Sequence, residues 1–211
     1  MKLFYASGAS SLAPNILLEE SGLQYSVEKV NLDKKTWNGG NYNLINPKSY
    51  VPALQTNNGK ILTECAIILE YIAIKAGNNK FIAKYDSSEY WQQRIWLNYI
   101  ASELHKNFIS PFRKGNWLPN TKESKKLVYK RVFPRLKFVD QKLNKQNYLV
   151  NNTFSAPDTY LFVMTNWLHR LNFGFTNLDN LKRFDTKMRK RPAVQTILRQ
   201  EGLPHSLQDE S

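Results

Sequence analysis

Two neighbouring stretches of the chain carry groups that could bind a small polar ligand. Val51-Pro52 opens a short apolar run, and Glu64 ends the next one, Ile61-Leu62-Thr63. Proline cannot donate to a strand ladder, so the free backbone groups of Val51 are expected to face something other than a neighbouring strand. A bound peptide could take that place, although a strand of an ordinary sheet can also begin with proline.

A second polar group stands at the end of an otherwise apolar helical pattern. Its members are Asn98, Glu103, His105 and Lys106. Asn98 and Lys106 are related by two steps of four residues through Ser102, whereas Glu103 and His105 point to other faces of a helix. A histidine in this setting is more often a surface or packing residue than a catalytic one, so spacing alone leaves its role open.

The elements that must position these groups alternate between strands and helices. Residues 2–5 and 25–32 indicate strands, and the helix between them begins at Ser10-Ser11 and stops at Gly22. An Asn-Asn-Gly turn joins the strand after Val51-Pro52 to another, and a helix follows over residues 65–76. The expected order is strand, helix, strand, loop, two strands and a helix.

The remainder of the chain has a helical pattern. Residues 78–86 form the expected domain boundary, because they follow a glycine stop and precede helix-starting residues. Pro134 should kink a long helix expected over about residues 121–145, unless a bulge relieves the kink. Ser155-Ala156-Pro157-Asp158 predicts a helix start with a capping box. The sequence therefore predicts a mixed α/β domain at 1–80 and an all-helical domain at 87–211.

Composition favours a folded protein of a reducing compartment. Hydrophobic residues make up 42% of the 211 residues, and Cys65 is the single cysteine, so no internal disulfide can form. The apolar run after Lys2 is too short for a signal peptide, and no run approaches the roughly 18 apolar residues of a membrane span. We expect a cytoplasmic protein with no membrane segment.

The formal net charge of +13 is unevenly distributed. Residues 1–80 carry eight Lys and Arg against six Asp and Glu, so most of the excess lies in the second half, in clusters at 113–145 and 182–199. Such a surface could attract nucleic acid or acidic partners. A solvated helical face is the simpler interpretation, and without an accompanying nucleic-acid motif we expect no nucleic-acid ligand.

The chain resembles a bacterial glutathione S-transferase, closest to the beta class. Matching stretches run in family order from residue 2 to about residue 203. They are Lys2-Leu3-Phe4-Tyr5, Gly8-Ala9-Ser10-Ser11-Leu12, Asn46-Pro47-Lys48, Val51-Pro52-Ala53-Leu54, Leu62-Thr63-Glu64, Trp96 to Lys106, Phe154 to Leu161 and Arg191-Pro192-Ala193-Val194. The resemblance implies a thioredoxin-like N-terminal domain followed by an all-helical C-terminal domain.

The resemblance also implies a binding site for glutathione, which acts as co-substrate, and no metal. Val51 would pair through its backbone with the cysteinyl part, next to a cis bond to Pro52. Glu64 and the backbone of Cys65 suit the γ-glutamyl amine and carboxylate. Lys35 would meet the glycyl carboxylate, with Lys34 as the alternative, although both can be solvated loop charges.

The same resemblance assigns a role to the polar group at the end of the apolar helix. The residues matching Asn98, Glu103, His105 and Lys106 line the cleft in the beta class, and some of them do so across a dimer interface. The resemblance therefore implies a homodimer in which this cluster helps to hold glutathione or the second substrate.

The thiol-activating position departs from the family. Beta-class enzymes typically carry cysteine where this chain has Ser10, and a hydroxyl cannot perform thiol-disulfide exchange. Ser10 can still donate a hydrogen bond to the glutathione thiolate near a helix N-terminus, as serine does in other classes of the family. A capping role for Ser10 or Ser11, or activation by Ser11, remains open.

The predicted function is conjugation of glutathione to hydrophobic electrophiles, a reaction that serves detoxification. An apolar wall is expected from Phe108, Phe112, Trp117 and Trp167, and the identity of the electrophile is left open. One alternative is a non-enzymatic relative that binds a macromolecular partner through its basic helical domain. Another is a glutathione-dependent reductase or peroxidase, which Ser10 disfavours because that chemistry needs a sulfur nucleophile.

Overall fold

The computed structural model describes residues 1–108 and 118–204. Its first part is a four-stranded mixed sheet in the order β2-β1-β5-β6, in which β1 is parallel to β2 and antiparallel to β5. The strands are β1 (Lys2–Tyr5), β2 (Ser26–Lys29), β5 (Ala53–Gln55) and β6 (Ile61–Thr63). This arrangement confirms the order of elements that the sequence predicts for the first part of the chain.

Both faces of β1 are buried, which explains the uninterrupted apolar run Leu3-Phe4-Tyr5. Leu3 packs with Leu54 in the main core. Phe4 belongs to a smaller cluster on the opposite face, together with Val51 and Tyr42. The second cluster fixes the loop that carries Val51 against the sheet.

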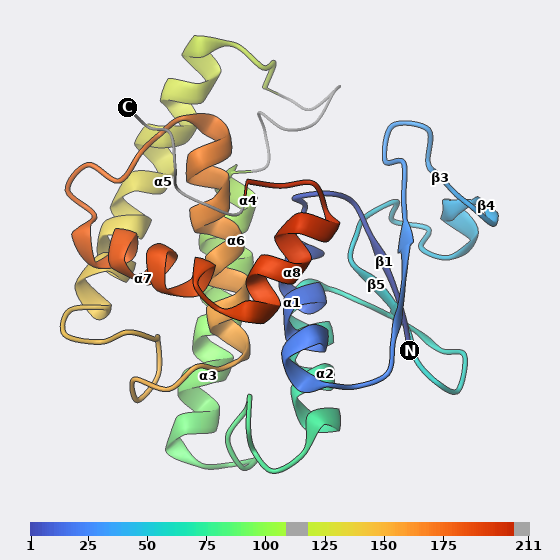
Figure 1. Ribbon diagram of the computed structural model, residues 1–211. Coiled ribbons are helices and arrows are strands. Elements are labelled where there is room, and N and C mark those ends of the chain that lie inside the picture. The colour runs from blue at the N-terminus through green and yellow to red at the C-terminus, as the bar shows by residue number, and fades with distance from the viewer. Residues whose placement is uncertain (109–117, 205–211) are drawn as a thin grey trace.

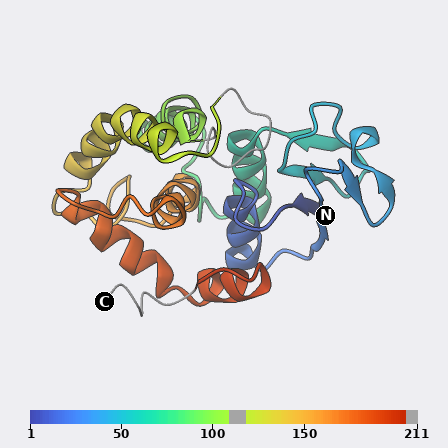
Figure 2. The same ribbon diagram turned by 90° about the horizontal axis from the view of Figure 1, so that it is seen from above.

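Two helices cover the face of the sheet that carries Leu3. They are α1 (Leu12–Ser21) and α2 (Cys65–Ala76), and both lie between the sheet and the other helices (Figures 1 and 2). Each helix ends at a glycine with positive φ, Gly22 at 68° and Gly77 at 74°, as the sequence predicts. Ser11 stands at the N-cap of α1, but its side chain makes no capping hydrogen bond.

The expected loop between β2 and β5 contains a small hairpin that the sequence did not predict. It consists of β3 (Thr36–Trp37) and β4 (Gly40–Asn41), followed by the short 3-10 helix η1 (Tyr42–Leu44). Trp37 anchors the hairpin, because its ring meets that of Phe4 edge-on at a centroid distance of 5.1 Å. The hairpin stands apart from the helices (Figure 1).

The rest of the described chain is helical. The elements are α3 (Ser88–Tyr99), the π-helical segment η2 (Ile100–His105), α4 (Lys106–Phe108), α5 (Lys122–Lys142), α6 (Ala156–Leu171), α7 (Asp179–Arg189) and α8 (Pro192–Gln200). Helix α5 continues through Pro134. None of the helices in the described ranges is long and apolar enough to cross a membrane.

Helix α6 is buried along almost its whole length and lies among the other helices of this part (Figure 2). The capping box predicted at Ser155 is present, since a carboxylate oxygen of Asp158 accepts from the Ser155 backbone N–H at 2.8 Å. The other oxygen accepts from the N–H of Leu149 at 2.9 Å. Burial raises the pKa of Asp158 to about 7. This helix positions Tyr160, Trp167 and Arg170 next to the first domain.

Candidate functional site

The turn between β1 and α1 meets the loop before β5, and Ser10 lies at that junction. The Ser10 hydroxyl donates to the carbonyl oxygen of Val51 at 3.2 Å, and the Ser10 side chain is buried. The peptide bond between Val51 and Pro52 is cis, as the resemblance implies. The structure therefore brings together three of the predicted site residues, Ser10, Val51 and Pro52.

Ser11 is held differently from its neighbour. Its hydroxyl accepts from the N–H of Ala6 at 3.1 Å and donates to the Ala6 carbonyl at 3.2 Å. The residue is fully buried, and both hydrogen-bonding roles of the hydroxyl are directed to the backbone of the turn. The geometry assigns Ser11 to closing the turn that presents Ser10.

Cys65 begins helix α2 directly beside Ser10. Its thiol donates to the carbonyl oxygen of Ser10 at 3.5 Å, and the side chain is buried. Burial raises the pKa of Cys65, with a smaller opposing effect from a hydrogen bond to Tyr160, so the thiol stays protonated near neutral pH. As the first residue of α2, Cys65 leaves its backbone N–H without an intrahelical partner. This donor could meet a carboxylate.

Glu64 precedes Cys65 and pairs with a residue that the sequence did not place in the site. The ammonium of Lys48 lies 2.5 Å from a carboxylate oxygen of Glu64 and 2.8 Å from the Thr63 hydroxyl. Both side chains of the ion pair remain largely exposed. Lys48 belongs to Asn46-Pro47-Lys48, one of the stretches that carry the family resemblance. That match was the sequence signal that could have placed Lys48 in the site.

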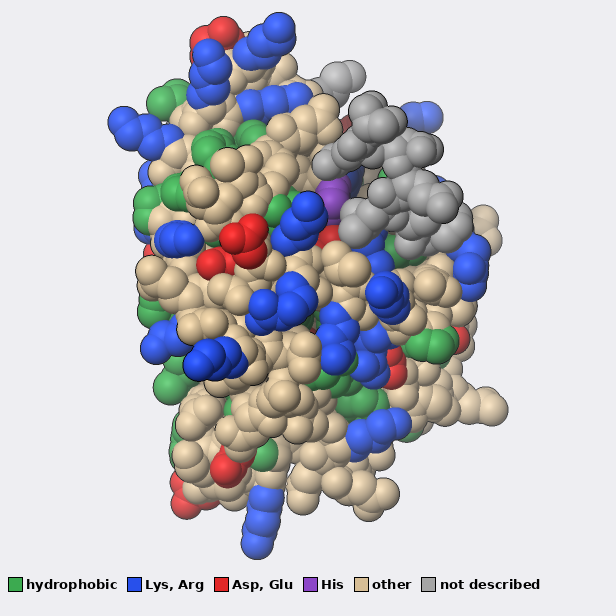
Figure 3. All heavy atoms as spheres, turned by 60° about the vertical axis from the view of Figure 1, so that its left-hand side comes forward, with side chains coloured by type: hydrophobic (Ala, Val, Ile, Leu, Met, Phe, Trp, Pro, Cys, Tyr) green, Lys and Arg blue, Asp and Glu red, His purple; other side chains and the backbone are tan. Residues whose placement is uncertain are grey.

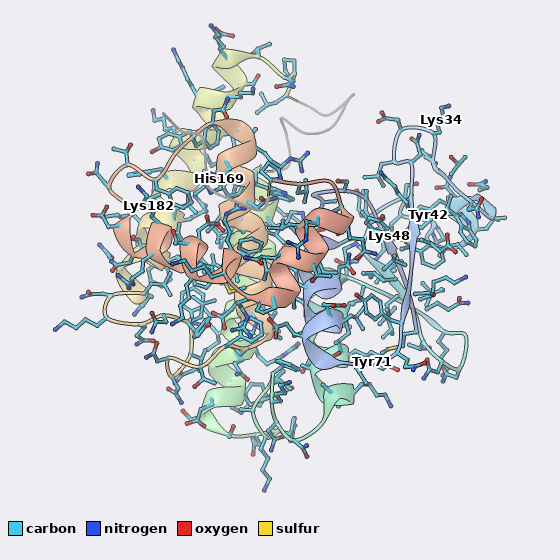
Figure 4. All side chains as sticks on the ribbon, in the orientation of Figure 1. Lys34, Tyr42, Lys48, Tyr71, His169 and Lys182 are labelled. Atoms are coloured by element: carbon cyan, nitrogen blue, oxygen red, sulfur yellow. The ribbon has the colours of Figure 1, made fainter. Side chains whose placement is uncertain are left out.

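Lys35 lies farther out, before the β3-β4 hairpin. Its φ is 54°, and its carbonyl accepts from the N–H of Tyr42 at 2.9 Å. Lys34 lies at the tip of the same loop, at the upper right of Figure 4 and away from the labelled Lys48 and Tyr42. Both lysines are exposed. Glu64 therefore pairs with Lys48, from the loop before β5. The contact of Lys35, or of Lys34, with a glycyl carboxylate stays a prediction.

The polar group at the end of α3 divides into inward and outward members. A ring nitrogen of His105, Nδ1, lies 2.6 Å from the hydroxyl of Tyr160, which also contacts Cys65. Glu103 pairs with Arg135 of α5 at 2.9 Å. Asn98 and Lys106 are exposed. Among the described contacts, His105 is therefore the member of this group that connects to Ser10, through Tyr160 and Cys65.

Residues from the helical part hold the turn before Ser10. The indole N–H of Trp167 donates to the Gly8 carbonyl at 2.8 Å, and Arg170 donates to the same oxygen at 2.6 Å. The carboxylate of Glu201 accepts from the Gly8 N–H at 2.9 Å and from Asn15 at 3.0 Å. Gly8 has a φ of 66°, and a Cβ there would lie 2.7 Å from the Arg170 side chain, so this position favours glycine.

The environment of Glu201 affects its protonation. Burial raises its pKa to about 7, against smaller lowering effects from its hydrogen bonds to Asn15 and Gly8 and from the cations Lys29 and Arg170. Trp167, Arg170 and Glu201 were not predicted as supports of the turn. They are more than 150 residues from Gly8 in sequence, beyond the reach of any local spacing pattern.

Two buried aromatic side chains lie next to His105. The ring of Trp167 meets the rings of His105 and Phe108 edge-on, at centroid distances of 5.0 and 5.9 Å. The other two residues predicted for the apolar wall, Phe112 and Trp117, lie outside the described residues. Within residues 1–108 and 118–204, no group of three His, Cys, Asp or Glu side chains could hold a metal ion.

The mixed sheet followed by a helical part is the two-domain architecture of a glutathione transferase, and comparisons with known proteins identify the family. Residues 1–74 match the family model described as glutathione S-transferase, N-terminal domain, and residues 95–192 match the C-terminal domain model. The chain belongs to the glutathione S-transferase family.

Individual relatives agree with this assignment. Glutathione S-transferase GstA of Escherichia coli O157:H7 is 37% identical over 205 residues, which cover 96% of this chain and 100% of the relative. A sphingomonad glutathione S-transferase complexed with glutathione has a TM-score of 0.88 and 32% identity, over 97% of this chain and 100% of its own. The beta-class enzyme of Sphingomonas chungbukensis has a TM-score of 0.89, 32% identity and the same coverage. These relatives support a transferase that conjugates glutathione.

Proposed function

We propose that the protein transfers the glutathione thiolate to hydrophobic electrophiles, with Ser10 as the group that stabilises the thiolate. The observation that supports this most directly is the Ser10 hydroxyl at 3.2 Å from the Val51 carbonyl, beside the start of α2. A ligand cysteine paired with the backbone of Val51 would bring its sulfur close to that hydroxyl. The nucleophile is then the ligand's own thiolate.

The ends of glutathione would be held by the groups around this point. The N–H of Cys65, which has no partner within α2, suits the γ-glutamyl carboxylate, and Glu64 suits the amine. Lys48 lies close enough to Glu64 to orient it or to meet a ligand carboxylate. Lys35 remains the proposed contact for the glycyl carboxylate, and Asn98, Glu103, His105 and Lys106 are proposed contacts from the helical part.

Serine in place of cysteine limits the chemistry at the site. A hydroxyl can donate to a thiolate, but it cannot form a mixed disulfide. The thiol of Cys65, the one cysteine of the chain, is buried and protonated near neutral pH. This disfavours the reductase or peroxidase alternative. Trp167 and Phe108 would form part of the wall that excludes water from the thiolate.

The proposal includes a cytoplasmic homodimer with a glutathione-binding domain at 1–80 and the electrophile site in the helical domain at 87–211. Exposed apolar side chains support assembly. The most exposed are Leu44 at 83%, Tyr85 at 72%, Ile95 at 65% and Ile74 at 59%. A homodimer would bury apolar surface of this kind where the two copies meet.

Retention on immobilised glutathione, followed by a conjugation assay with several hydrophobic electrophiles, tests the proposal. Retention with turnover is the expected result. Retention without turnover would favour the non-enzymatic alternative, whose support is the basic surface of the helical part. Glutathione-dependent reduction of peroxides or mixed disulfides would favour the reductase alternative, and absence of both retention and turnover would contradict all glutathione-dependent activities.

A further inference from the structure

Helix α7, the start of α8 and Tyr148 line an open groove in the helical part. The groove has a volume of about 870 Å³. Its cationic lining consists of Lys182, Arg183, Lys187, Lys190 and Arg191. The face that carries α7 shows Lys and Arg side chains gathered near its centre (Figure 3). Because the groove is open to solvent, a ligand in it would keep part of its surface in water.

The five cations fall into two kinds. The two arginines are fixed by other parts of the chain. Arg183 donates to the carbonyls of Leu143 and Gln146 at 2.7 and 3.0 Å, and Arg191 makes two hydrogen bonds to Glu20 at 2.6 and 3.0 Å. Arg191 also donates to the hydroxyl of Tyr148 at 3.0 Å. These contacts form a fixed frame for the groove.

The three lysines have no carboxylate within ion-pairing distance in the described parts of the chain. Lys187 lies over the ring of Tyr148, with its nitrogen 5.4 Å from the ring centre. Lys182 and Lys190 are exposed, and Lys182 projects outward from α7 (Figure 4). Asp179 is the single acid in the lining. Among the residues that the structure describes, the lysines of the groove therefore form an excess of positive charge over Asp179.

The spacing of these residues concentrates the charge along one face. Lys182 and Lys190 are eight residues apart, with Thr186 midway, and Arg183 and Lys187 are four apart on the neighbouring row. Like charges at this spacing repel one another across a helix. The other acid of α7, Asp185, is buried and paired with Arg189 and His169, so it does not offset the groove. A multivalent anion would relieve the repulsion.

We infer that this groove binds a small polyphosphate anion, with Lys182, Lys187 and Lys190 as the charged contacts. Lysine suits a phosphate as a mobile point charge, and several lysines around one cavity favour two or three linked phosphates over a single one. Tyr148 and Arg191, which are hydrogen-bonded to each other, also line the groove, and Thr186 adds a hydroxyl donor. The inference is independent of glutathione binding, because the groove shares no residue with the proposed site.

Calorimetry with inorganic triphosphate and with ATP at constant ionic strength tests the inference. The double variant Lys182→Gln/Lys190→Gln should bind triphosphate at least tenfold more weakly. The matched control is Lys122→Gln/Lys126→Gln on exposed positions of α5, which removes the same charge elsewhere and should change the affinity less than threefold. Equal affinity for triphosphate and ATP would assign binding to the phosphates alone, and tighter binding of ATP would identify a nucleotide.

A second measurement uses the wild-type chain: mass spectrometry shows which lysines triphosphate protects from acetylation. Triphosphate should protect Lys182, Lys187 and Lys190 and leave Lys122 and Lys126 reactive. Equal losses of affinity in both double variants, or uniform protection, would show diffuse attraction of a polyanion to a basic surface and overturn the inference. Absence of binding at millimolar triphosphate would also overturn it. Both double variants should be retained on immobilised glutathione as the wild type is.

Discussion

The Ser10 hydroxyl and the Val51 carbonyl, 3.2 Å apart, link the two features of the proposed site that the sequence placed on separate elements. Ser10 follows β1, whereas Val51 precedes β5, its neighbour in the sheet. In the free protein the Ser10 proton is directed to Val51. Binding of a thiolate would redirect that proton to sulfur, while the ligand backbone takes over the Val51 carbonyl. The hydrogen bond thus keeps the donor in place without leaving a buried hydroxyl unpaired.

Replacement of Ser10 by alanine should slow conjugation and raise the pH at which bound glutathione ionises. The reason is loss of a donor to the charged form. A hydrogen bond to a charged group contributes about 1.5–3 kcal/mol, which corresponds to a rise of about one to two pH units. Ultraviolet absorbance of the thiolate across a pH titration measures this shift. In Ser11→Ala the ionisation pH should stay the same and stability should fall, because Ser11 bonds to Ala6.

Replacement of Ser10 by cysteine should introduce different chemistry. A sulfur nucleophile at this position can form a mixed disulfide with glutathione, which mass spectrometry detects, and can support thiol-disulfide exchange. Ser10→Ala serves as the control that lacks both groups. If Ser10→Cys forms no mixed disulfide under oxidising conditions while it still binds glutathione, residue 10 does not face the thiol and the assignment of Ser10 is wrong.

Glu64→Gln should weaken glutathione binding by about 1.5–3 kcal/mol, the range for a hydrogen bond to a charged group. The substitution keeps the shape of the side chain and removes its charge, so isothermal calorimetry reports the interaction with the ligand amine. Lys48 pairs with Glu64 at 2.5 Å, so Lys48→Met tests whether Lys48 orients Glu64 or itself contacts the ligand. If Lys48 only orients Glu64, Lys48→Met should weaken glutathione binding less than Glu64→Gln does. An unchanged affinity in Glu64→Gln would show that the amine is held elsewhere.

Local patterns were sufficient for most of the fold and for only part of the site. Strand and helix order, the glycine stops and the capping box at Ser155 follow from signals a few residues long. Lys48 was missed as a partner of Glu64, because a lysine after Asn46-Pro47 reads as a solvated charge in a turn. The contacts of Trp167 and Glu201 with Gly8 join distant parts of the chain, and no residue spacing encodes them. The β3-β4 hairpin was missed since each strand has two residues.

Glu201 should make stability depend on pH. Its pKa is raised from 4.5 to about 7 in the folded protein, so the folded state holds a proton that the unfolded state loses between these values. Its contribution to stability is therefore complete below about pH 4.5 and is lost as pH rises through about 7. In Glu201→Gln, the free energy of unfolding should fall less over this interval, by up to about 3 kcal/mol.

Urea unfolding at several pH values measures this dependence. Asp158 also has a pKa raised to about 7 and contributes a slope of the same sign, so the slope in Glu201→Gln should decrease without disappearing. Asp158→Asn is the matched comparison in the other buried carboxylate. Identical pH profiles for the wild type and Glu201→Gln would mean that Glu201 is ionised throughout this range in the folded protein, stabilised by Gly8, Asn15 and Arg170.

Sedimentation equilibrium should give a dimer of about 49 kDa, twice the 24.6 kDa of the chain. Leu44 has 83% of its surface exposed and Ile95 has 65%, and each is expected to lose that exposure in the dimer. Leu44→Lys or Ile95→Lys should therefore shift the protein toward monomer, whereas Lys122→Gln on α5 should leave the mass unchanged. If the dimer contributes Glu103 to a shared site, the monomeric variants should also bind glutathione more weakly. A wild-type monomer would place Glu103 outside any shared site and leave its pairing with Arg135 as a structural contact.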